Sequence, residues 1–459
     1  MANVDQLKLF DVSAPLKRAL LLAPLLIAAL CSWYGVRWYL GNTLAEVAPG
    51  MEEGGLDTAQ LALRLAPDDP LTHWTKASLE KRTLLTELMP QVVPQYEKAV
   101  SLSPNEYRLW MDLGVAREQA GDRAGGELAL RRAVELAPWY ADPRWFLGNL
   151  LLRAGNYDEA FRELRRASEA NPATYRPQVF NVAWQVFGQD TAAMQRAVGE
   201  TPAVRAALAA FLLERGRETE ALSLWSSLRP AEKREQRDIG QGLFASLLGK
   251  NRYRAAQGLA RDLAGEGFEA GQFQNGGFES NEERAGASNA FGWQLQSVSQ
   301  AKISFDPQNA HGGSRSLRVL FNASANLGFN LISQTIVVEP STQYRLECYV
   351  RTDDLKTASA PLLEVVDLSD NALLAASKPL PVGTNDWQSV TFDFKTTAKT
   401  EAIVVRTNRA PCNMEGAACP IFGTIWYDDF NLQRLGANAQ PGNSSGGSGN
   451  VGAREGRTH

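Results

Sequence analysis

Hydrophobic and polar positions divide the chain into three regions. Residues 19–36 read "ALLLAPLLIAALCSWYGV" and carry no charged side chain. From about residue 56 to 265, apolar residues recur at helical spacing between segments that end in "AP" or "NP". After residue 265 short alternating runs such as "RSLRVLF" and "EAIVVRT" follow one another, which is typical of strands. We therefore predict a multidomain chain in which an α-helical part precedes a β-rich part.

The uncharged run has about the length that crosses a thin bilayer. Lys8, Lys17 and Arg18 precede it and acidic residues follow it, so the positive-inside rule places the amino end in the cytoplasm. We expect a cytoplasmic segment over 1–18 and a transmembrane anchor over 19–40 in the inner, cytoplasmic membrane, with the bulk of the chain periplasmic or extracellular. A cleaved signal peptide and a buried core helix are the alternatives. No clear Ala-x-Ala site follows the run, which favours the anchor.

Several residues of the helical region recur at a fixed distance of 34 positions. The recurring pairs include Gly114 with Gly148 and Gly121 with Gly155, and a proline returns at the same interval. Small residues at such positions let two helices approach closely, and proline ends a helix because it has no backbone N–H to donate. A period of this length indicates an array of helix pairs.

The segments "WMDLGVAREQAGDRAGGELALRRAVELAP" and "FLGNLLLRAGNYDEAFRELRRASEANP" resemble the tetratricopeptide repeat family. The resemblance implies an α-solenoid over residues 56–265, with five to six helix pairs and a concave groove that binds a protein partner. The groove is expected to be formed by first-helix side chains, namely Arg108, Asp112, Gln119, Trp145, Asn149 and Arg153. For any single position, an ordinary solvated helix surface is the alternative.

Eight alternating runs separated by turns predict a β-sandwich or barrel after residue 265. The succession of "NGGFES", "HGGSRSLRV" and "GTIWYDDFNLQRL" resembles the jelly-roll carbohydrate-binding modules that are attached to bacterial glycoside hydrolases. It covers nearly all of residues 273–435, and we place this domain at 268–436. The resemblance implies the fold and, less specifically, contact with a polysaccharide.

The same resemblance implies one structural calcium ion. Glu279 and Asp429 would supply carboxylates, and backbone carbonyl groups from about His311 to Arg315 would complete an oxygen shell, which suits a hard cation. Strand alternation places Asp428 on the opposite face from Asp429, and a buried Asp428 would need a hydrogen-bond donor. Two exposed acids at the end of a strand are the alternative.

Glycan binding usually requires an aromatic side chain beside polar groups. In "QYRLECYVRT" alternation buries Tyr344 and turns Tyr349 and Arg351 outward, and the same reasoning turns Arg406 and Tyr427 outward. We expect Tyr349, Arg351, Arg406 and Tyr427 to line one concave sheet face. The tryptophans of this region are expected to pack in the core or at its rim.

Composition narrows the function classes. The net charge of −4 and the lack of a basic face argue against nucleic-acid binding. Cys412 and Cys419 lie in a proline-bounded loop, where a disulfide is favoured over free thiols if the domain is outside the cytoplasm. With 3 histidines and no nucleotide or zinc motif, we expect no enzyme, and a cryptic glycoside hydrolase is the weaker alternative.

These observations favour a non-enzymatic, membrane-anchored extracytoplasmic scaffold. The solenoid would bind a protein, and the jelly roll would contact a glycan during assembly or export of a surface polysaccharide such as an exopolysaccharide. The alternative is a surface protein that captures glycans, in which the repeats serve as a spacer. The Gly-, Ser- and Asn-rich tail over 437–459 is expected to be disordered.

Overall fold

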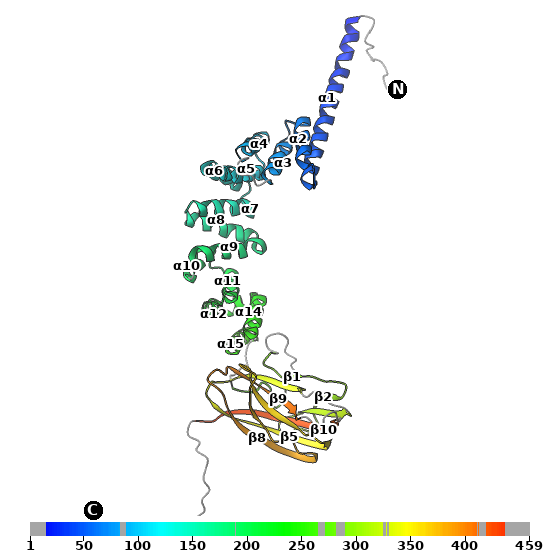
Figure 1. Ribbon diagram of the computed structural model, residues 1–459, viewed down its shortest axis with the longest axis vertical. Helices are drawn as coiled ribbons and strands as arrows, with labels where there is room; N and C mark the ends of the chain where they lie inside the picture. The colour runs from blue at the N-terminus through cyan, green and yellow to red at the C-terminus, as the bar shows by residue number, and fades with distance from the viewer. Residues whose placement is uncertain are drawn as a thin grey trace, which may run out of the picture. The chain divides into compact units, whose positions relative to one another are not determined.

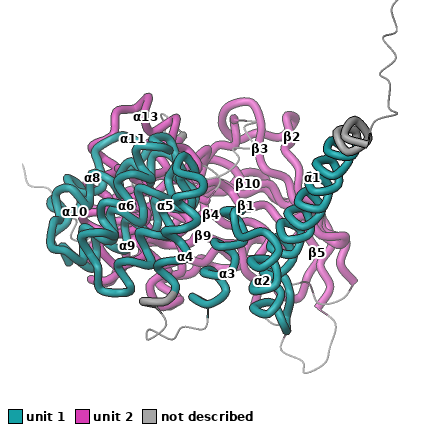
Figure 2. Tube along the Cα trace, turned by 90° about the horizontal axis from the view of Figure 1, so that it is seen from above, with its two compact units in different colours: residues 1–204 teal, residues 205–459 magenta. Residues whose placement is uncertain are grey.

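A computed structural model describes residues 15–82, 89–188, 190–264, 271–280, 290–324, 327, 330–410, 412 and 419–436. The chain divides into two compact units, residues 1–204 and residues 205–459 (Figure 2). Each unit is described by itself below. Most of the expected cytoplasmic segment and the whole expected tail lie outside the described residues.

Unit 1 is helical throughout its described residues (Figure 1). Its helices pack as neighbours along the chain: α3 contacts α4, α5 contacts α6, α7 contacts α8 and α9 contacts α10. The helices are α1 (Pro15–Val47), the 3-10 turn η1 (Ala48–Gly50), α2 (Gly55–Leu65), α3 (Pro70–Arg82), α4 (Met89–Leu102), α5 (Tyr107–Gln119), α6 (Arg123–Leu136), α7 (Ala141–Arg153), α8 (Tyr157–Ala170), α9 (Pro172–Phe187) and α10 (Thr191–Val198).

Glycines explain why the helix pairs of unit 1 pack so closely. A Cβ atom on Gly114 would lie 2.6 Å from Cγ of Leu130, and one on Gly148 would lie 2.7 Å from Cγ of Leu164. Both leucines are fully buried, so they have no room to withdraw. The recurrence every 34 residues therefore reflects one contact between the two helices of each repeat.

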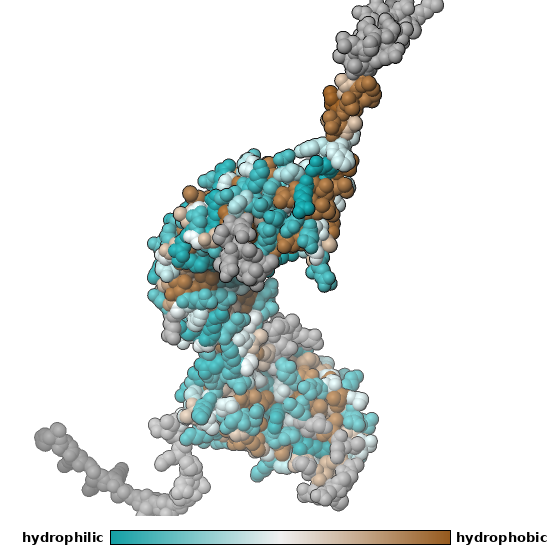
Figure 3. All heavy atoms as spheres, turned by 45° about the horizontal axis from the view of Figure 1, so that its top comes forward, coloured by the Kyte–Doolittle hydropathy of each residue, from teal (hydrophilic) through white to brown (hydrophobic). Residues whose placement is uncertain are grey.

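The helix α1 differs from the predicted anchor. It runs on past residue 40, and its last turns pack on the repeats: Arg37 donates to the carbonyl oxygen of Arg64 at 3.0 Å and Asn42 donates to Asp69 at 2.9 Å. Figure 3 shows hydrophobic side chains along this helix, and those of Leu26 and Trp33 among others are exposed.

Within the described ranges, no helix combines the length and apolar character that crossing a membrane requires. The predicted anchor over 19–40 is therefore not supported.

Unit 2 contains helices as well as the predicted β-rich domain. The helices are α11 (Pro202–Glu214), which crosses the unit boundary, α12 (Glu218–Ser226), α13 (Pro230–Glu235), α14 (Arg237–Gly249) and α15 (Tyr253–Ala264). Two arginines join α15 and the turn before it to the β-rich domain: Arg252 pairs with Glu401 at 2.9 Å, and Arg254 pairs with Glu339 at 3.2 Å. Unit 2 thus contains the last helices of the solenoid predicted over 56–265 together with the β-rich domain predicted over 268–436.

Two antiparallel sheets form the β-rich domain (Figure 1). One sheet has the strand order β1-β4-β9-β6-β7, and the other, called sheet B here, has the order β2-β3-β10-β5-β8. The strands are β1 (Gln294–Leu295), β2 (Ala301–Asp306), β3 (Ser316–Ala323), β4 (Ile332–Val337), β5 (Gln343–Thr357), β6 (Pro361–Asp367), β7 (Leu373–Ala376), β8 (Gly383–Lys395), β9 (Ala402–Arg409) and β10 (Ile421–Arg434).

One continuous core lies between the two sheets. Alternate residues of each strand point into it, among them Leu346, Cys348 and Val350 of β5. All eight predicted runs are strands, and the short β1 and β7 are additional. The prediction of a helical repeat region followed by a β-sandwich is thus confirmed.

Candidate functional site

A groove of about 750 Å³ lies on the surface of unit 1. Helix α5, the first turn of α6 and helix α7 form its walls. Its lining residues are Val115, Glu118, Gln119, Gly121, Arg123, Trp145, Phe146, Asn149 and Arg153. Four of the six residues predicted for a protein-binding groove, namely Gln119, Trp145, Asn149 and Arg153, therefore come together here.

The groove combines an aromatic floor with oriented polar groups. Trp145 packs against Tyr175 with ring centroids 5.1 Å apart, which holds the indole in place. Arg153 makes a two-pronged ion pair with Glu118, at 2.8 and 2.7 Å. The side chain of Asn149 donates to the carbonyl oxygen of Trp145 at 2.8 Å. These bonds orient the groove before any partner arrives.

Arg123 is the groove cation that remains available. It makes no ion pair in the part of the chain that the structure describes, whereas Arg153 is neutralised by Glu118. The groove therefore keeps one net positive charge. A partner that offers a carboxylate next to an apolar side chain would match both the charge and the floor.

Arg108 and Asp112 do not line this groove, although they lie on the same helix α5. Asp112 accepts a hydrogen bond from the indole of Trp74 at 2.6 Å and so faces the preceding helix pair. Burial raises the pKa of Asp112. Arg108 lies over the ring of Tyr107, with its guanidinium carbon 5.7 Å from the ring centroid.

Repeat spacing could have identified two further lining residues. Val115 lies 34 positions before Asn149, and Phe146 lies 34 positions after Asp112, so each occupies the position equivalent to a residue that was predicted for the groove. Arg123 carried no such signal. Its place in the groove depends on the turn between α5 and α6.

The predicted glycan residues do not share one face of the sandwich. Tyr349 and Arg351 lie on the outer face of sheet B, where Tyr349 stacks on His311 with centroids 3.6 Å apart. Arg406 belongs to β9 in the other sheet and pairs with Glu364 at 3.0 Å. Tyr427 is only 1% exposed and lies between the sheets. The prediction of a common concave face is wrong for Arg406 and Tyr427.

A β-bulge in β10 explains the error at Tyr427. The pairing of β10 with β5 shifts between Asp428 and Asn431, and Asp429 adopts φ +49°. Before the bulge Tyr427 faces the core, and after it Phe430 does so. Simple alternation assigns these two residues to opposite faces, because it has no means of registering the extra residue.

Asp428 is a fully buried carboxylate that backbone amides hold in place. One oxygen accepts from the N–H groups of His311 at 2.8 Å and Gly312 at 3.2 Å, and the other accepts from the N–H of Asp429 at 2.8 Å. Burial raises the pKa of Asp428, and these bonds oppose that shift. Three backbone N–H groups thus provide the hydrogen-bond donors that the buried carboxylate of Asp428 requires.

Glu279 and Asp429, the predicted calcium ligands, lie beside the same loop as Asp428. Glu279 accepts from the N–H and the hydroxyl of Ser314, at 2.9 and 2.5 Å, and the hydroxyl bond contributes most to lowering the pKa of Glu279. Asp429 contacts the ring of His311 at 2.7 Å. The loop directs amide groups, rather than the expected carbonyl groups, to these carboxylates.

The carboxylate oxygens of Glu279 and Asp429 beside this loop are the type of ligand that a hard cation prefers. A Cβ on Gly312 would lie 2.5 Å from a carboxylate oxygen of Asp429, so the loop comes close only because it has glycine there. No group of three or more acidic, histidine or cysteine side chains within the described ranges is spaced to hold a metal ion.

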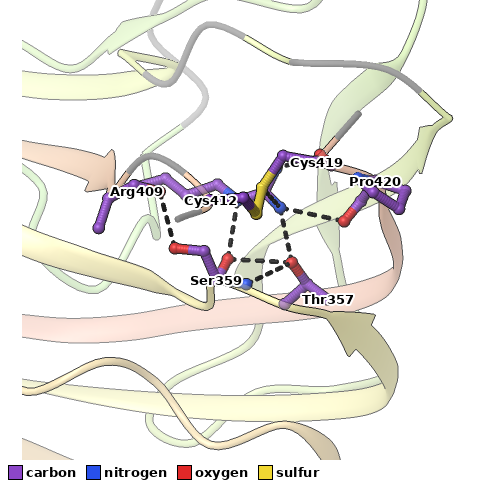
Figure 4. Close-up of a disulfide and its surroundings, with 7 residues drawn as sticks. Thr357, Ser359, Arg409, Cys412, Cys419 and Pro420 are labelled. Atoms are coloured by element: carbon purple, nitrogen blue, oxygen red, sulfur yellow. Dashed lines mark hydrogen bonds between the residues drawn. A yellow bond between two sulfur atoms is a disulfide. The ribbon is translucent and has the colours of Figure 1, made fainter. Parts of the chain in front are cut away.

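The predicted disulfide between Cys412 and Cys419 is present, with Cα atoms 5.7 Å apart (Figure 4). A buried arginine, Arg409, supports it. Its guanidinium donates to the carbonyl oxygen of Cys419 at 2.9 Å and to the hydroxyl of Thr357 at 2.7 Å. Burial lowers the pKa of Arg409. Figure 4 shows these groups around the sulfur atoms.

Comparison with protein families identifies both kinds of domain. Residues 270–412 match a family of carbohydrate binding domains, and residues 118–181 match a tetratricopeptide repeat family. The predictions of tetratricopeptide repeats and of a domain like carbohydrate-binding modules are thereby confirmed.

Comparison with individual proteins gives remote similarity. The tRNA(Glu)-specific nuclease WapA of Bacillus subtilis subsp. natto (strain BEST195) is 27% identical over 151 residues, which are 31% of this chain and 6% of that protein. The chain thus spans a small part of the curated relative that it matches.

Solved structures resemble each part separately. A CBM4 module is 15% identical, with 36% of this chain and 99% of that chain covered and a TM-score of 0.27. The CBM22-1 xylan-binding domain of Paenibacillus barcinonensis Xyn10C is 14% identical, with coverages of 37% and 99% and a TM-score of 0.26. A crystal structure of MamA is 14% identical, with coverages of 48% and 95% and a TM-score of 0.28.

Proposed function

We propose that the protein is a non-enzymatic scaffold that binds a segment of a partner protein through its repeats and contacts a polysaccharide through its β-sandwich. The observation that carries the proposal is the groove between α5 and α7. Tetratricopeptide repeats and carbohydrate-binding domains are typically not catalytic, which agrees with the absence of a catalytic motif in the sequence.

The groove has the chemistry of a peptide site. Trp145 and Phe146 offer apolar area, and Arg123 offers a cation without an ion pair in the described part of the chain. Tryptophan and arginine dominate binding energies at protein interfaces, because they combine large contact area with directed donors. We infer that the bound segment presents an acidic residue beside an apolar one.

The disulfide supports a location outside the cytoplasm, where thiols are oxidised. A place on the outer side of the cytoplasmic membrane and a role in assembly or export of a surface polysaccharide remain predictions from the sequence. The combination of protein-binding repeats with a carbohydrate-binding type of domain favours that role over simple attachment to a surface.

A structural calcium ion remains part of the proposal. Glu279 and Asp429, the two predicted ligands, border one glycine-containing loop, and within the described ranges they form no group of three side chains spaced for a metal ion, so binding would require them to move closer together. The ion would bind carboxylate oxygens and stabilise the rim of the sandwich. Calorimetry of the full chain tests this: calcium should raise the melting temperature and a chelator should reverse the rise. An unchanged melting temperature would remove the metal.

Selection from a displayed random peptide library tests protein binding. Peptides enriched by the full chain should lose about thirtyfold or more in affinity for Trp145→Ala, since interface tryptophans of this kind contribute roughly 2 kcal/mol or more. Arg123→Glu should reverse the preference for acidic peptides. Arg132→Glu, which changes an exposed arginine of α6 outside the groove, is the matched control. Selected peptides that bind all variants equally would overturn the proposal.

The second candidate is glycan capture with the repeats as a spacer, and the carbohydrate-binding type of the sandwich favours it. A glycan array separates the candidates when it is combined with the peptide selection. Glycan binding without any groove-dependent peptide binding would support capture. Groove-dependent peptide binding would support the scaffold.

A further inference from the structure

The outer face of sheet B carries a row of two arginines around one tryptophan. Trp426 lies directly opposite Arg318 of β3 on one side and Arg351 of β5 on the other. The two guanidinium carbons lie 5.8 and 5.6 Å from the centre of the indole ring. Both arginines therefore make cation–π contacts with the same ring, which covers Trp426 and leaves it 6% exposed.

Hydrogen bonds hold one arginine and the tryptophan in place, but not the other arginine. Arg351 donates to the side-chain oxygen of Asn309 at 2.8 Å, and the indole N–H of Trp426 donates to Asp306 at 2.8 Å. The Nε atom of Arg318 is buried and has no hydrogen-bond partner within the described residues. Because that atom is shielded from solvent, a ligand would meet Arg318 at its terminal guanidinium nitrogens, and Arg318 makes no ion pair within the described residues.

The charge of the two arginines favours an anion as the ligand. Asp306 is the carboxylate that interacts with Arg318, and it already accepts bonds from Gln308, Asn309 and Trp426. Arg351 is bonded to the neutral amide of Asn309, so within the described residues neither arginine forms an ion pair. A guanidinium offers parallel donors in a planar fork, which fits the two oxygens of a carboxylate.

Aromatic rings border the row on the same sheet. Tyr349 precedes Arg351 by two positions on β5, and it stacks on His311, whose ring also meets Trp387 at a centroid distance of 5.6 Å. Ring edges and hydroxyl groups next to paired cations suit a sugar ring that carries a carboxylate. An inorganic anion would make no use of them.

We propose that Arg318 and Arg351 bind the carboxylate of a uronic acid residue in a polysaccharide that lies along the outer face of sheet B. The inference rests on the proposed glycan contact of the sandwich and adds the chemical class of the sugar. Trp426 acts as the support that orients both guanidinium groups.

Affinity electrophoresis of the full chain tests the inference with three polymers. Polygalacturonate is the acidic probe, the same polymer after reduction of its carboxyl groups is the neutral probe, and polyglutamate tests a protein carboxylate. We expect retardation by polygalacturonate alone. Arg318→Gln and Arg351→Gln should each weaken this binding about tenfold or more, because each removes a charge-assisted contact.

Two further variants separate binding from folding. Arg318→Lys keeps a cation over the indole but loses the fork, so binding should weaken while the melting temperature stays near that of the wild type. Arg345→Gln is the matched control, because Arg345 lies on the same face of β5 but is already paired with Asp393 at 2.7 Å. Its binding should equal that of the wild type.

Four results would overturn the inference. Equal retardation by the carboxyl-reduced polymer would reject the acidic sugar while leaving glycan binding intact. Unchanged binding by Arg318→Gln would reject the row as the binding site. Stronger binding to polyglutamate would assign the row to a protein partner. No retardation by either sugar polymer would reject the uronate site, and a panel of neutral glycans then decides separately whether the sandwich binds glycans at all.

Discussion

Two glycines on helix α14 provide a matched test of how closely the helices of unit 2 pack. A Cβ on Gly240 would lie 2.6 Å from Cη2 of Trp225 and 2.8 Å from Cδ2 of Leu263. A Cβ on Gly242, two residues further along the same helix, would meet nothing within 4 Å. Substitution by alanine at the two positions therefore differs in its steric consequence and hardly in any other.

The magnitude follows from two opposing effects. Replacing glycine by alanine inside a helix stabilises it by roughly 0.5–1 kcal/mol. Inserting a methyl group into a filled core costs about 1–3 kcal/mol. The ring of Trp225 is 1% exposed and donates to Asp262 at 3.1 Å, so it has little freedom to withdraw. We expect Gly242→Ala to stabilise α14, and Gly240→Ala to be less stable than Gly242→Ala by about 1–3 kcal/mol.

Hydrogen exchange of the full chain measures this difference, because it reports the free energy of local opening helix by helix. Amides of α12 and α14 should exchange faster in Gly240→Ala than in Gly242→Ala. Equal protection in the two variants would refute the reasoning, since it would mean that the helices are not in contact at Gly240.

Three further predictions concern the β-sandwich. Burial raises the pKa of Asp428, so the folded domain binds the carboxyl proton more tightly than the unfolded chain does. The contribution of Asp428 to stability should therefore fall as the pH rises from about 3.9 through the pKa of the folded state. In Asp428→Asn, the plot of melting temperature against pH should no longer show this decrease. The pKa of Glu279 is lowered, so its effect on stability has the opposite pH dependence. Its stabilisation is present above about pH 4.3 and is lost as the pH falls through the pKa of the folded state. In Glu279→Gln, the melting temperature should decrease less over this pH range. Replacing both Cys412 and Cys419 by serine should lower the free energy of unfolding by roughly 2–3 kcal/mol in urea titrations, because a loop of this length no longer restricts the unfolded chain. If a substitution leaves its pH titration or urea titration unchanged, that result would count against the contact that the substitution removes.

The repeat region could be predicted because its signal is local and recurs. Gly114 and Gly148 meet Leu130 and Leu164 in the same way, so a packing constraint appears in the sequence as a period. The groove was predictable in part for the same reason, since Gln119 and Arg153 occupy equivalent positions. Asp112 shares the helix but bonds Trp74 of an earlier pair, and no period reveals that choice.

The sandwich was predictable as a set of strands but not as a surface. Which residues face outward depends on sheet membership and register, and both are set by contacts between distant segments. Arg406 lies in a different sheet from Arg351, and the bulge at Asp429 turns Tyr427 into the core. The row of Arg318, Trp426 and Arg351 exists only because three strands align at one level.

The central claim is that the groove between α5 and α7 binds a partner protein. The most direct measurement places a photo-reactive amino acid at Gln119 or Asn149 in the chain produced in its native cells, with Arg132 of α6 as the control position outside the groove. The account predicts one discrete crosslinked protein from both groove positions and none from position 132. Crosslinks absent from both groove positions, or identical at position 132, would contradict it.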